Sequence, residues 1–298
     1  MHLDAATILL QWATGGLAFG WVTTRRREVS LGYGWLLRIV YGSLALLAFG
    51  AELRSGHHGV GHAIFLVSAA GVVVAAAVAL TVSIVRRGAG VSGVHERAER
   101  KAARVAAMTG ADAPVGDTAL ADPVASDVVR PRGREFPPAL DLPAPVIGAI
   151  GLVAAAQFTG GAFWLAGLRL LVGAAFLGVV TDAMLLGHWY LTQPGLPREP
   201  LKELVRWAGW VWPVELVVLL LPPGMIAVVT GTHDDGYGGL LGWMWVVCAI
   251  TTGVLIGVTW AALRERYYSA VMAATGLLYL AILTAFGTDL VARAVLAP

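Results

Sequence analysis

An aspartate lies inside an apolar stretch of this chain that is long enough to cross a membrane. Asp182 occupies the run LGVVTDAMLLGHWY at positions 177–190. A carboxylate in the hydrocarbon layer costs roughly 2.5 to 3.5 kcal/mol on insertion scales, so such a residue is usually paired, protonated or functional. Asp182 is therefore the first candidate for chemistry in this sequence.

Arg38 and Glu215 are two further ionisable residues that are predicted within the membrane. With a rise of 1.5 Å per residue, Arg38 lies about 9 Å and Asp182 about 13 Å from the same membrane face. These similar depths predict an Arg38–Asp182 ion pair, and Glu215 is expected nearer the midplane. The three side chains would form the polar end of a proton path, a quinone site or a solute site. The alternative is an ion pair that only joins two helices.

His188 is the one histidine that is predicted within a span. It lies six residues from Asp182, or about 240° around a helix, so the two side chains do not share a face. His188 could ligate haem, carry a proton or bond a quinone headgroup. The alternative is a place in an interfacial aromatic belt with Trp189 and Tyr190.

Histidines also gather in loops that are predicted on the opposite membrane face. His58 and His62 are four residues apart, and a helical turn would place both imidazoles on one side, where they could hold a metal or haem. The intervening glycines disfavour that helix, and a hydrated loop is the alternative. His57 and His233 complete the candidate ligands on this face. Because His188 is predicted at the other face, it could not share a haem with them.

The composition predicts an all-helical, polytopic membrane bundle. Of the 298 residues, 57% are hydrophobic and 13% are charged, whereas soluble domains carry about 25% charged residues. The apolar residues form long runs, and about 20 residues cross a bilayer. About eight transmembrane helices are expected, and Pro222-Pro223 should break or kink the sixth. The predicted spans cover residues 5–23, 32–52, 63–85, 144–162, 168–191, 205–230, 239–262 and 269–295.

The distribution of basic residues predicts the orientation of the chain. Arg25-Arg26-Arg27 follows the first span, and the first residues lack the basic region of a signal peptide. With both termini extracytoplasmic, 17 of the 21 Lys and Arg residues fall on the cytoplasmic side, three fall outside, and Arg38 lies within a span. This asymmetry follows the positive-inside rule.

A polar segment divides the spans into two groups. Residues 1–85 hold three spans, residues 86–143 form a cytoplasmic linker, and residues 144–298 hold five spans. Positions 94–108 are expected to form a charged helix, either solvated or resting on anionic headgroups. The remainder of the linker is rich in Ala, Asp, Pro and Gly and is expected to be flexible.

A weak internal repeat relates the first and last pairs of spans. Thr14-Gly15 precedes Glu52 by 38 residues, and Thr252-Gly253 precedes Asp289 by 37. Internal repeats are common in transporters, although the shared composition of membrane helices also produces such similarity by chance.

These features suggest three functions. The first is a subunit or small enzyme of membrane electron transfer that binds a quinone or haem b, because polar groups occur at both membrane faces. The second is a small-solute or ion transporter, proton-coupled through Asp182 and Glu215. The third is a non-catalytic scaffold or assembly subunit of a membrane complex. The lipid bilayer is the expected partner, together with other membrane subunits.

Other classes receive no support from the sequence. A net charge of +2 indicates no nucleic-acid partner. The single cysteine, Cys248, excludes an internal disulfide and a cysteine-based zinc or iron–sulfur site. The sequence also contains no Walker loop, dinucleotide-binding glycine fingerprint, paired-histidine zinc motif or haem-attachment motif.

Overall fold

The computed structural model describes residues 4–93, 134–193, 196–222, 224–265 and 267–296, and within these ranges the regular elements are all helices. The predicted charged helix at 94–108 lies outside the described residues. The elements are α1 (Ala5–Thr24), α2 (Leu31–Glu52), α3 (Val60–Val85), η1 (Arg87–Ala89), η2 (Pro138–Asp141), α5 (Pro143–Ala155), α6 (Phe163–Thr192), α7 (Glu199–Leu220), α8 (Met225–Val229), α9 (Leu240–Ala262) and α10 (Tyr268–Val295).

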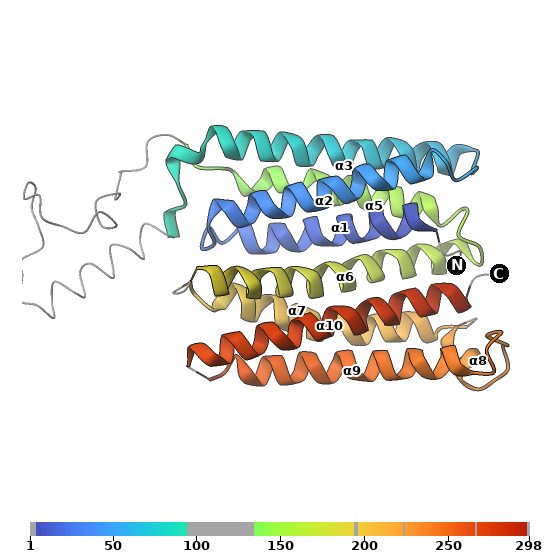
Figure 1. Ribbon diagram of the computed structural model, residues 1–298. Coiled ribbons are helices and arrows are strands. Elements are labelled where there is room, and N and C mark those ends of the chain that lie inside the picture. The colour runs from blue at the N-terminus through green and yellow to red at the C-terminus, as the bar shows by residue number, and fades with distance from the viewer. Residues whose placement is uncertain (1–3, 94–133, 194–195, 223, 266, 297–298) are drawn as a thin grey trace, which may run out of the picture.

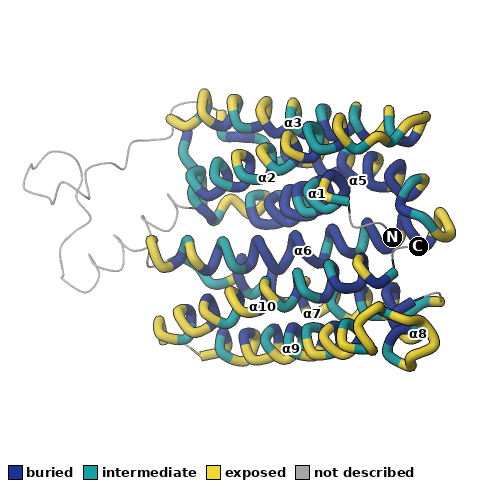
Figure 2. The backbone as a smooth tube through the Cα atoms, turned by 45° about the vertical axis from the view of Figure 1, so that its right-hand side comes forward, coloured by how far each residue is buried: buried dark blue, intermediate teal, exposed yellow. Residues whose placement is uncertain are grey.

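The long helices run alongside one another, and α6 lies in the middle of the bundle (Figures 1 and 2). Helix α1 packs on α2, α5 and α6, while α10 packs on α6 and α9. Helix α1 begins and α10 ends at the same end of the bundle, which we call the terminal end (Figure 1). The opposite end, which we call the basic end, carries Arg25, Arg26 and Arg27 after α1 and Arg198 before α7.

Seven segments in the described part of the chain are long and apolar enough to cross a membrane. They are α1, α2, α3, the continuous segment Pro138–Ala155, α6, α9 and α10. Their outward faces carry exposed apolar side chains, such as Leu47, Val67 and Leu283 with 59%, 73% and 69% exposure. Lipid can cover such faces, whereas water would penalise them. The protein is therefore a helical, multi-pass membrane protein.

The predicted sixth span, 205–230, is interrupted in the structure. Helix α7 ends at Leu220, and the short α8 begins at Met225. The break lies at Pro222, which has no backbone donor and cannot continue a helix, so the predicted effect of the proline pair is confirmed. Helix α7 also carries charged residues in its first two turns, and it is not among the seven apolar segments.

Two glycines separate the fourth and fifth predicted spans. Helix α5 ends at Ala155 and α6 begins at Phe163. Between them Gly160 and Gly161 both have φ of 80°, a left-handed conformation that glycine adopts without the strain of a Cβ. The chain reverses direction here and enters the buried α6.

Helices α1 and α6 touch through their backbones. A Cβ on Gly15 would lie 1.7 Å from the carbonyl oxygen of Ala174, and one on Gly178 would lie 2.1 Å from the carbonyl carbon of Gly15. Small residues allow such close approach between membrane helices. This contact, which we call the α1–α6 seam, lies near the middle of both helices.

Part of the predicted linker is folded against the bundle. Phe136 is buried, and η2 follows directly before α5. Asp141 at the end of η2 is also buried. The linker predicted up to residue 143 thus includes a final part that packs on the bundle, where Asp141 pairs with Arg38.

Candidate functional site

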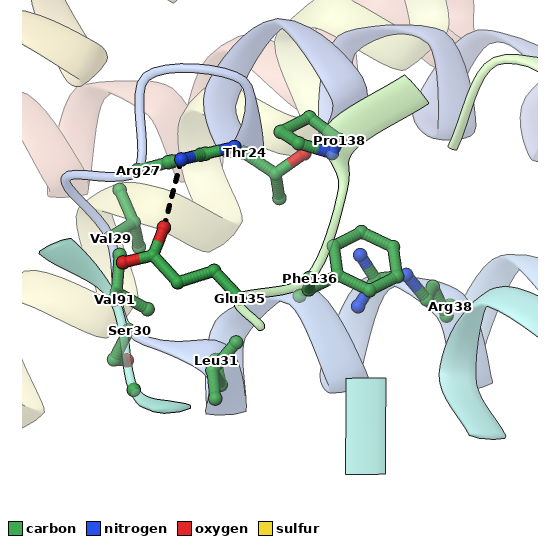
Figure 3. Close-up of a pocket in the computed structure, with 12 residues that line it drawn as sticks. Thr24, Arg27, Val29, Ser30, Leu31, Arg38, Val91, Glu135, Phe136 and Pro138 are labelled. Atoms are coloured by element: carbon green, nitrogen blue, oxygen red, sulfur yellow. Dashed lines mark hydrogen bonds and ion pairs between the residues drawn. The ribbon is translucent and has the colours of Figure 1, made fainter. Parts of the chain in front are cut away.

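Arg38 pairs with Asp141, so the predicted Arg38–Asp182 ion pair is wrong. The guanidinium donates from Nε to Asp141 Oδ1 at 2.8 Å and from Nη2 to Oδ2 at 2.7 Å. Thr24 Oγ1 donates to Asp141 Oδ2 at 3.1 Å. The guanidinium carbon also lies 4.4 Å from the Phe136 ring centroid. Figure 3 shows the Phe136 ring beside the Arg38 side chain. The two charges satisfy each other at the basic end.

A small cavity lies beside this pair. It measures about 30 Å³, enough for one water molecule. Thr24, Phe136 and Arg38 line it, and Arg27 and Glu135 form a 2.9 Å ion pair across it (Figure 3). It is too small for a cofactor.

Asp182 is fully buried between α1, α2 and α6. Tyr41 donates a short hydrogen bond to Asp182 Oδ1, and Tyr33 donates to the backbone oxygen of Asp182 at 3.1 Å. Within the described residues, Asp182 Oδ2 has no hydrogen-bond partner. A Cβ on Gly20 of α1 would lie 3.8 Å from this oxygen. Asp182 is thus held at one oxygen, and its other oxygen is turned towards α1.

A denser group of buried charges lies nearer the terminal end, and we call it the Glu215 cluster. Gln11 Nε2 donates to Asp289 Oδ1 at 3.3 Å, and Arg293 Nε donates to Asp289 Oδ2 at 2.8 Å. Glu215 of α7 lies within electrostatic range of Arg169, Asp289 and Arg293. The cluster joins four helices and consists of Gln11 of α1, Arg169 of α6, Glu215 of α7, and Asp289 and Arg293 of α10.

Several polar atoms of this cluster are buried without a hydrogen bond to any described residue. They are both carboxylate oxygens of Glu215, both terminal nitrogens of Arg293 and Oε1 of Gln11. Glu215 and Arg293 have no exposed surface. Buried polar groups almost always find partners, because an unpaired one costs about 1–3 kcal/mol and a charged one costs more. The cluster therefore has unused capacity to bind protons or polar ligands.

Gly173 of α6 leaves space for the side chains of Gln11 and Asp289. A Cβ there would lie 2.2 Å from Gln11 Nε2 and 3.0 Å from Asp289 Oδ1. The hydrogen bond between Gln11 and Asp289 thus passes directly over the α6 backbone. A residue larger than glycine would displace it.

Arg169 forms hydrogen bonds with backbone carbonyl groups at the C-terminal end of α7. Its Nη2 donates to the carbonyl oxygen of Leu221 at 2.8 Å, and its Nε donates to that of Val218 at 3.3 Å. The last carbonyls of a helix have no partner within the helix. Arg169 satisfies two of them and places its positive charge at the negative end of the α7 dipole.

The histidines at the terminal end surround a buried carboxylate. Glu52 Oε1 lies 2.7 Å from His62 Nδ1 and 3.2 Å from His57 Nδ1. The His57 ring stacks on Phe158 at 4.3 Å between centroids, while the rings of His58 and His62 lie 6.4 Å apart. The predicted hydrated loop is therefore partly packed, with Glu52 as its anchor.

The other two candidate histidines lie elsewhere. His188 is exposed on the outer face of α6 and bonds Tyr279 of α10 at 3.0 Å, so it does not join Arg38, Asp182 or Glu215. His233 lies 3.3 Å from the carbonyl oxygen of Val295. In the described part of the chain, no three His, Cys, Asp or Glu side chains are arranged to hold a metal ion.

Helix α1 contacts the three buried aspartates in order along its length. Gln11 bonds Asp289, Gly20 faces Asp182, and Thr24 bonds Asp141. At 1.5 Å per residue these contacts span about 20 Å of the helix. The α1–α6 seam lies between the first contact and the second.

Asp289 and Arg293 were present in the sequence but were not predicted as a site. Their spacing of four residues in an apolar helix could have identified them, because such residues lie on one face and can pair. Gln11 gave no signal, since a glutamine in a span carries no charge. Asp141 was assigned to the linker, outside the membrane.

Comparisons of the chain with models of protein families, with curated proteins and with solved structures found no match.

Proposed function

We propose that this protein is a proton-coupled transporter of a small solute or ion, and that the Glu215 cluster is its central site. The observation that carries this proposal is the pairing of two fully buried opposite charges, Glu215 and Arg293, without a hydrogen bond between them. A structural ion pair would use these atoms, as Arg38 and Asp141 do. A carboxyl group that must bind and release a proton needs atoms that are not permanently occupied.

The form of α7 supports the same proposal. Pro213 lies inside the helix two residues before Glu215, and the helix ends before Pro222. Interrupted helices near buried charges are typical of transporters, in which the irregular backbone lines the substrate site. Arg169 ties this end of α7 to α6, so the break adjoins the cluster.

Asp182 is the next group in the proposed proton path. It lies across the α1–α6 seam from the Glu215 cluster, and one of its oxygens has no partner among the described residues. The Tyr41 hydroxyl group, which donates to Asp182, can itself release a proton and accept a hydrogen bond. Intramembrane acids of this kind commonly form proton relays.

The test is proton flux into proteoliposomes that contain a trapped pH-sensitive dye. The wild-type protein should dissipate an imposed pH gradient, and Glu215→Gln should lower the rate by about tenfold or more, because a carboxamide cannot carry the proton. Asp182→Asn should lower it less. Equal rates for the wild type and both variants would contradict the proposal.

Glu52→Gln is the matched control. Glu52 is also fully buried, but it bonds His57 and His62 outside the cluster. Its replacement should leave proton flux at the wild-type rate. Unfolding in detergent, measured for each variant, separates a lost function from a lost fold.

The proposed topology has eight spans, which are the seven apolar segments and α7. Both termini are extracytoplasmic. Helix α7 packs against α6 and α9. It has 22 residues, which is long enough to cross the hydrocarbon layer. The concentration of arginine at the basic end supports a cytoplasmic location for that end and for the linker. Cysteine labelling of single variants from either side of a vesicle would test both points.

A surface groove favours quinone binding as a second candidate function. It measures about 430 Å³, lies between α1, α5 and α7, and is lined by Phe19, Trp21, Val146 and Trp207 together with Arg25. This shape suits an isoprenoid tail and a polar headgroup. Extraction of a quinone from the purified protein, and its loss in Trp207→Ala, would support this candidate.

The donor set gives haem b less support. His57 and His62 already engage Glu52, and His188 engages Tyr279. Neither of the two cavities described above is lined by a histidine. An absorbance spectrum of the purified protein with a Soret band would contradict this assessment.

A further inference from the structure

The charges of the Glu215 cluster cancel one another when all four are ionised. Arg169 and Arg293 are positive, and Glu215 and Asp289 are negative. All four side chains are at most 5% exposed. A net charge in such a place is expensive, because these side chains are withdrawn from the protein surface. Any event that changes one charge of the cluster therefore favours a second event that restores neutrality.

Protonation of Glu215 would leave the cluster with one excess positive charge. Asp289 stays paired, since its two oxygens accept from Arg293 and Gln11. Arg169 is engaged with the last carbonyls of α7. The excess charge is then shared by Arg169 and Arg293, and Arg293 has two terminal nitrogens that are buried and bond no described residue.

The Arg293 guanidinium is prepared to bind a planar anion. Its Nε donates to Asp289 at 2.8 Å, and the edge formed by the two terminal nitrogens bonds no described residue. A guanidinium edge donates two parallel hydrogen bonds that match the oxygens of a carboxylate or a planar oxyanion. A spherical or divalent anion fits this edge and this charge less well.

We infer that the Glu215 cluster binds one small monovalent planar anion, a carboxylate or an oxyanion such as nitrate, together with one proton. The proton adds to the Glu215 carboxylate, and the anion takes its place as the counter-charge of Arg293. No net charge enters the cluster, so the coupled movement of both is electroneutral. This inference rests on the proposed transport function and specifies its substrate class.

Binding is tested without transport by the melting temperature of the purified protein in detergent. Nitrate and formate should raise it more at pH 5.5 than at pH 8, and chloride and sulfate should raise it less, because a ligand stabilises the state that binds it. Glu215→Gln should keep the nitrate effect and lose its dependence on pH. No shift with nitrate or formate at either pH, in the wild type and in Glu215→Gln alike, would overturn the inference.

Arg293→Lys is the second variant, because it keeps the charge and removes the two-pronged edge. It should lose most of the nitrate effect while Arg38→Lys, at the bonded pair of the basic end, keeps it. Equal nitrate effects in Arg293→Lys and the wild type would also overturn the inference. If Arg293→Lys does not fold, the pH dependence of Glu215→Gln still decides.

Flux measurements distinguish this inference from the function on which it rests. In proteoliposomes, an inward proton gradient should drive nitrate uptake, and the uptake should persist when potassium and valinomycin clamp the membrane potential at zero. Proton flux at the full rate with sulfate as the sole anion would overturn anion coupling and leave proton transport intact. Absence of proton flux in every medium would overturn the proposed function itself.

Discussion

The two buried Arg–Asp pairs in the described part of the chain differ in how completely they are bonded. Arg38 and Asp141 share two hydrogen bonds, Thr24 and Phe136 complete their surroundings, and neither side chain has a buried atom without a partner. Arg293 uses only Nε on Asp289. Both pairs place charge within apolar segments. The difference teaches that burial alone does not distinguish these charges, whereas unused hydrogen-bonding capacity does, and the proposed function rests on that capacity.

The largest expected effect is the loss of Asp141. Asp141→Ala would leave the Arg38 guanidinium buried without its counter-charge, which should lower the free energy of unfolding by about 3–5 kcal/mol. Reversible unfolding in mixed micelles would measure it. Replacing both residues by leucine should restore most of the stability. A single variant as stable as the wild type would remove the distinction between the two pairs.

The α1–α6 seam, which separates the two regions, gives the next effect. Gly15→Ala would drive a Cβ into the Ala174 carbonyl and should cost about 1–3 kcal/mol or more, as overpacking does. Gly276→Ala in α10 is the matched control, because nothing lies within 4 Å of its added Cβ. The control should be within about 1 kcal/mol of the wild type, in the stabilising direction. Equal melting temperatures for both variants would argue against the close contact.

Within the Glu215 cluster, the bonded and the unbonded acid should differ in stability. Asp289→Asn weakens the bond from Arg293 Nε and should cost about 1.5–3 kcal/mol, since hydrogen bonds to charged groups have this magnitude. Glu215→Gln removes the same negative charge but breaks no hydrogen bond, so it should cost less stability than Asp289→Asn. Thermal unfolding of the two variants in one detergent makes the comparison. The reverse order would assign the structural role to Glu215.

The smallest effect lies outside the membrane, before α9. The partly buried Asp235 accepts hydrogen bonds from the backbone amides of Gly239, Tyr237, Leu241 and Gly242, and these bonds lower its pKa below the ordinary 3.8. A lowered folded-state pKa stabilises the loop above the ordinary value, and this contribution is lost as the pH falls through the folded value.

Amide hydrogen exchange should therefore rise at Leu241 and Gly242 in Asp235→Asn at neutral pH, and in the wild type at acidic pH after correction for intrinsic exchange rates. Asp234→Asn is the control, because Asp234 accepts a single bond from Gly236. Unchanged protection in Asp235→Asn would contradict the capping role.

The membrane architecture was accessible from the sequence, and the pairing of the charges was not. Run length and composition predicted spans, and Pro222 predicted the break in α7. Which charges meet depends on helix rotation and on short segments such as η2, whose proline-rich sequence resembles a linker. Asp182 was correctly expected to be inside an apolar helix, but its Tyr41 partner comes from α2 through a side chain that carries no charge.

The internal repeat stays a prediction, although its two acids occupy comparable places. Glu52 and Asp289 are both buried near the terminal end of their helices. Glu52 meets two histidines and Asp289 meets an arginine and a glutamine. The partners of Glu52 lie in the loop and helix that follow it, whereas those of Asp289 lie on α10 itself and on α1.

The contact of Gly15 with Ala174 and Gly178 has an electrical consequence. If water enters the bundle from each end as far as Asp182 and the Glu215 cluster, the membrane potential falls mainly across the thin dry layer at this contact. Each elementary charge that crosses the layer then experiences most of the available energy, about 2.3 kcal/mol per 100 mV. Gly15, Ala174 and Gly178 would thus determine where along the bundle the membrane potential changes most.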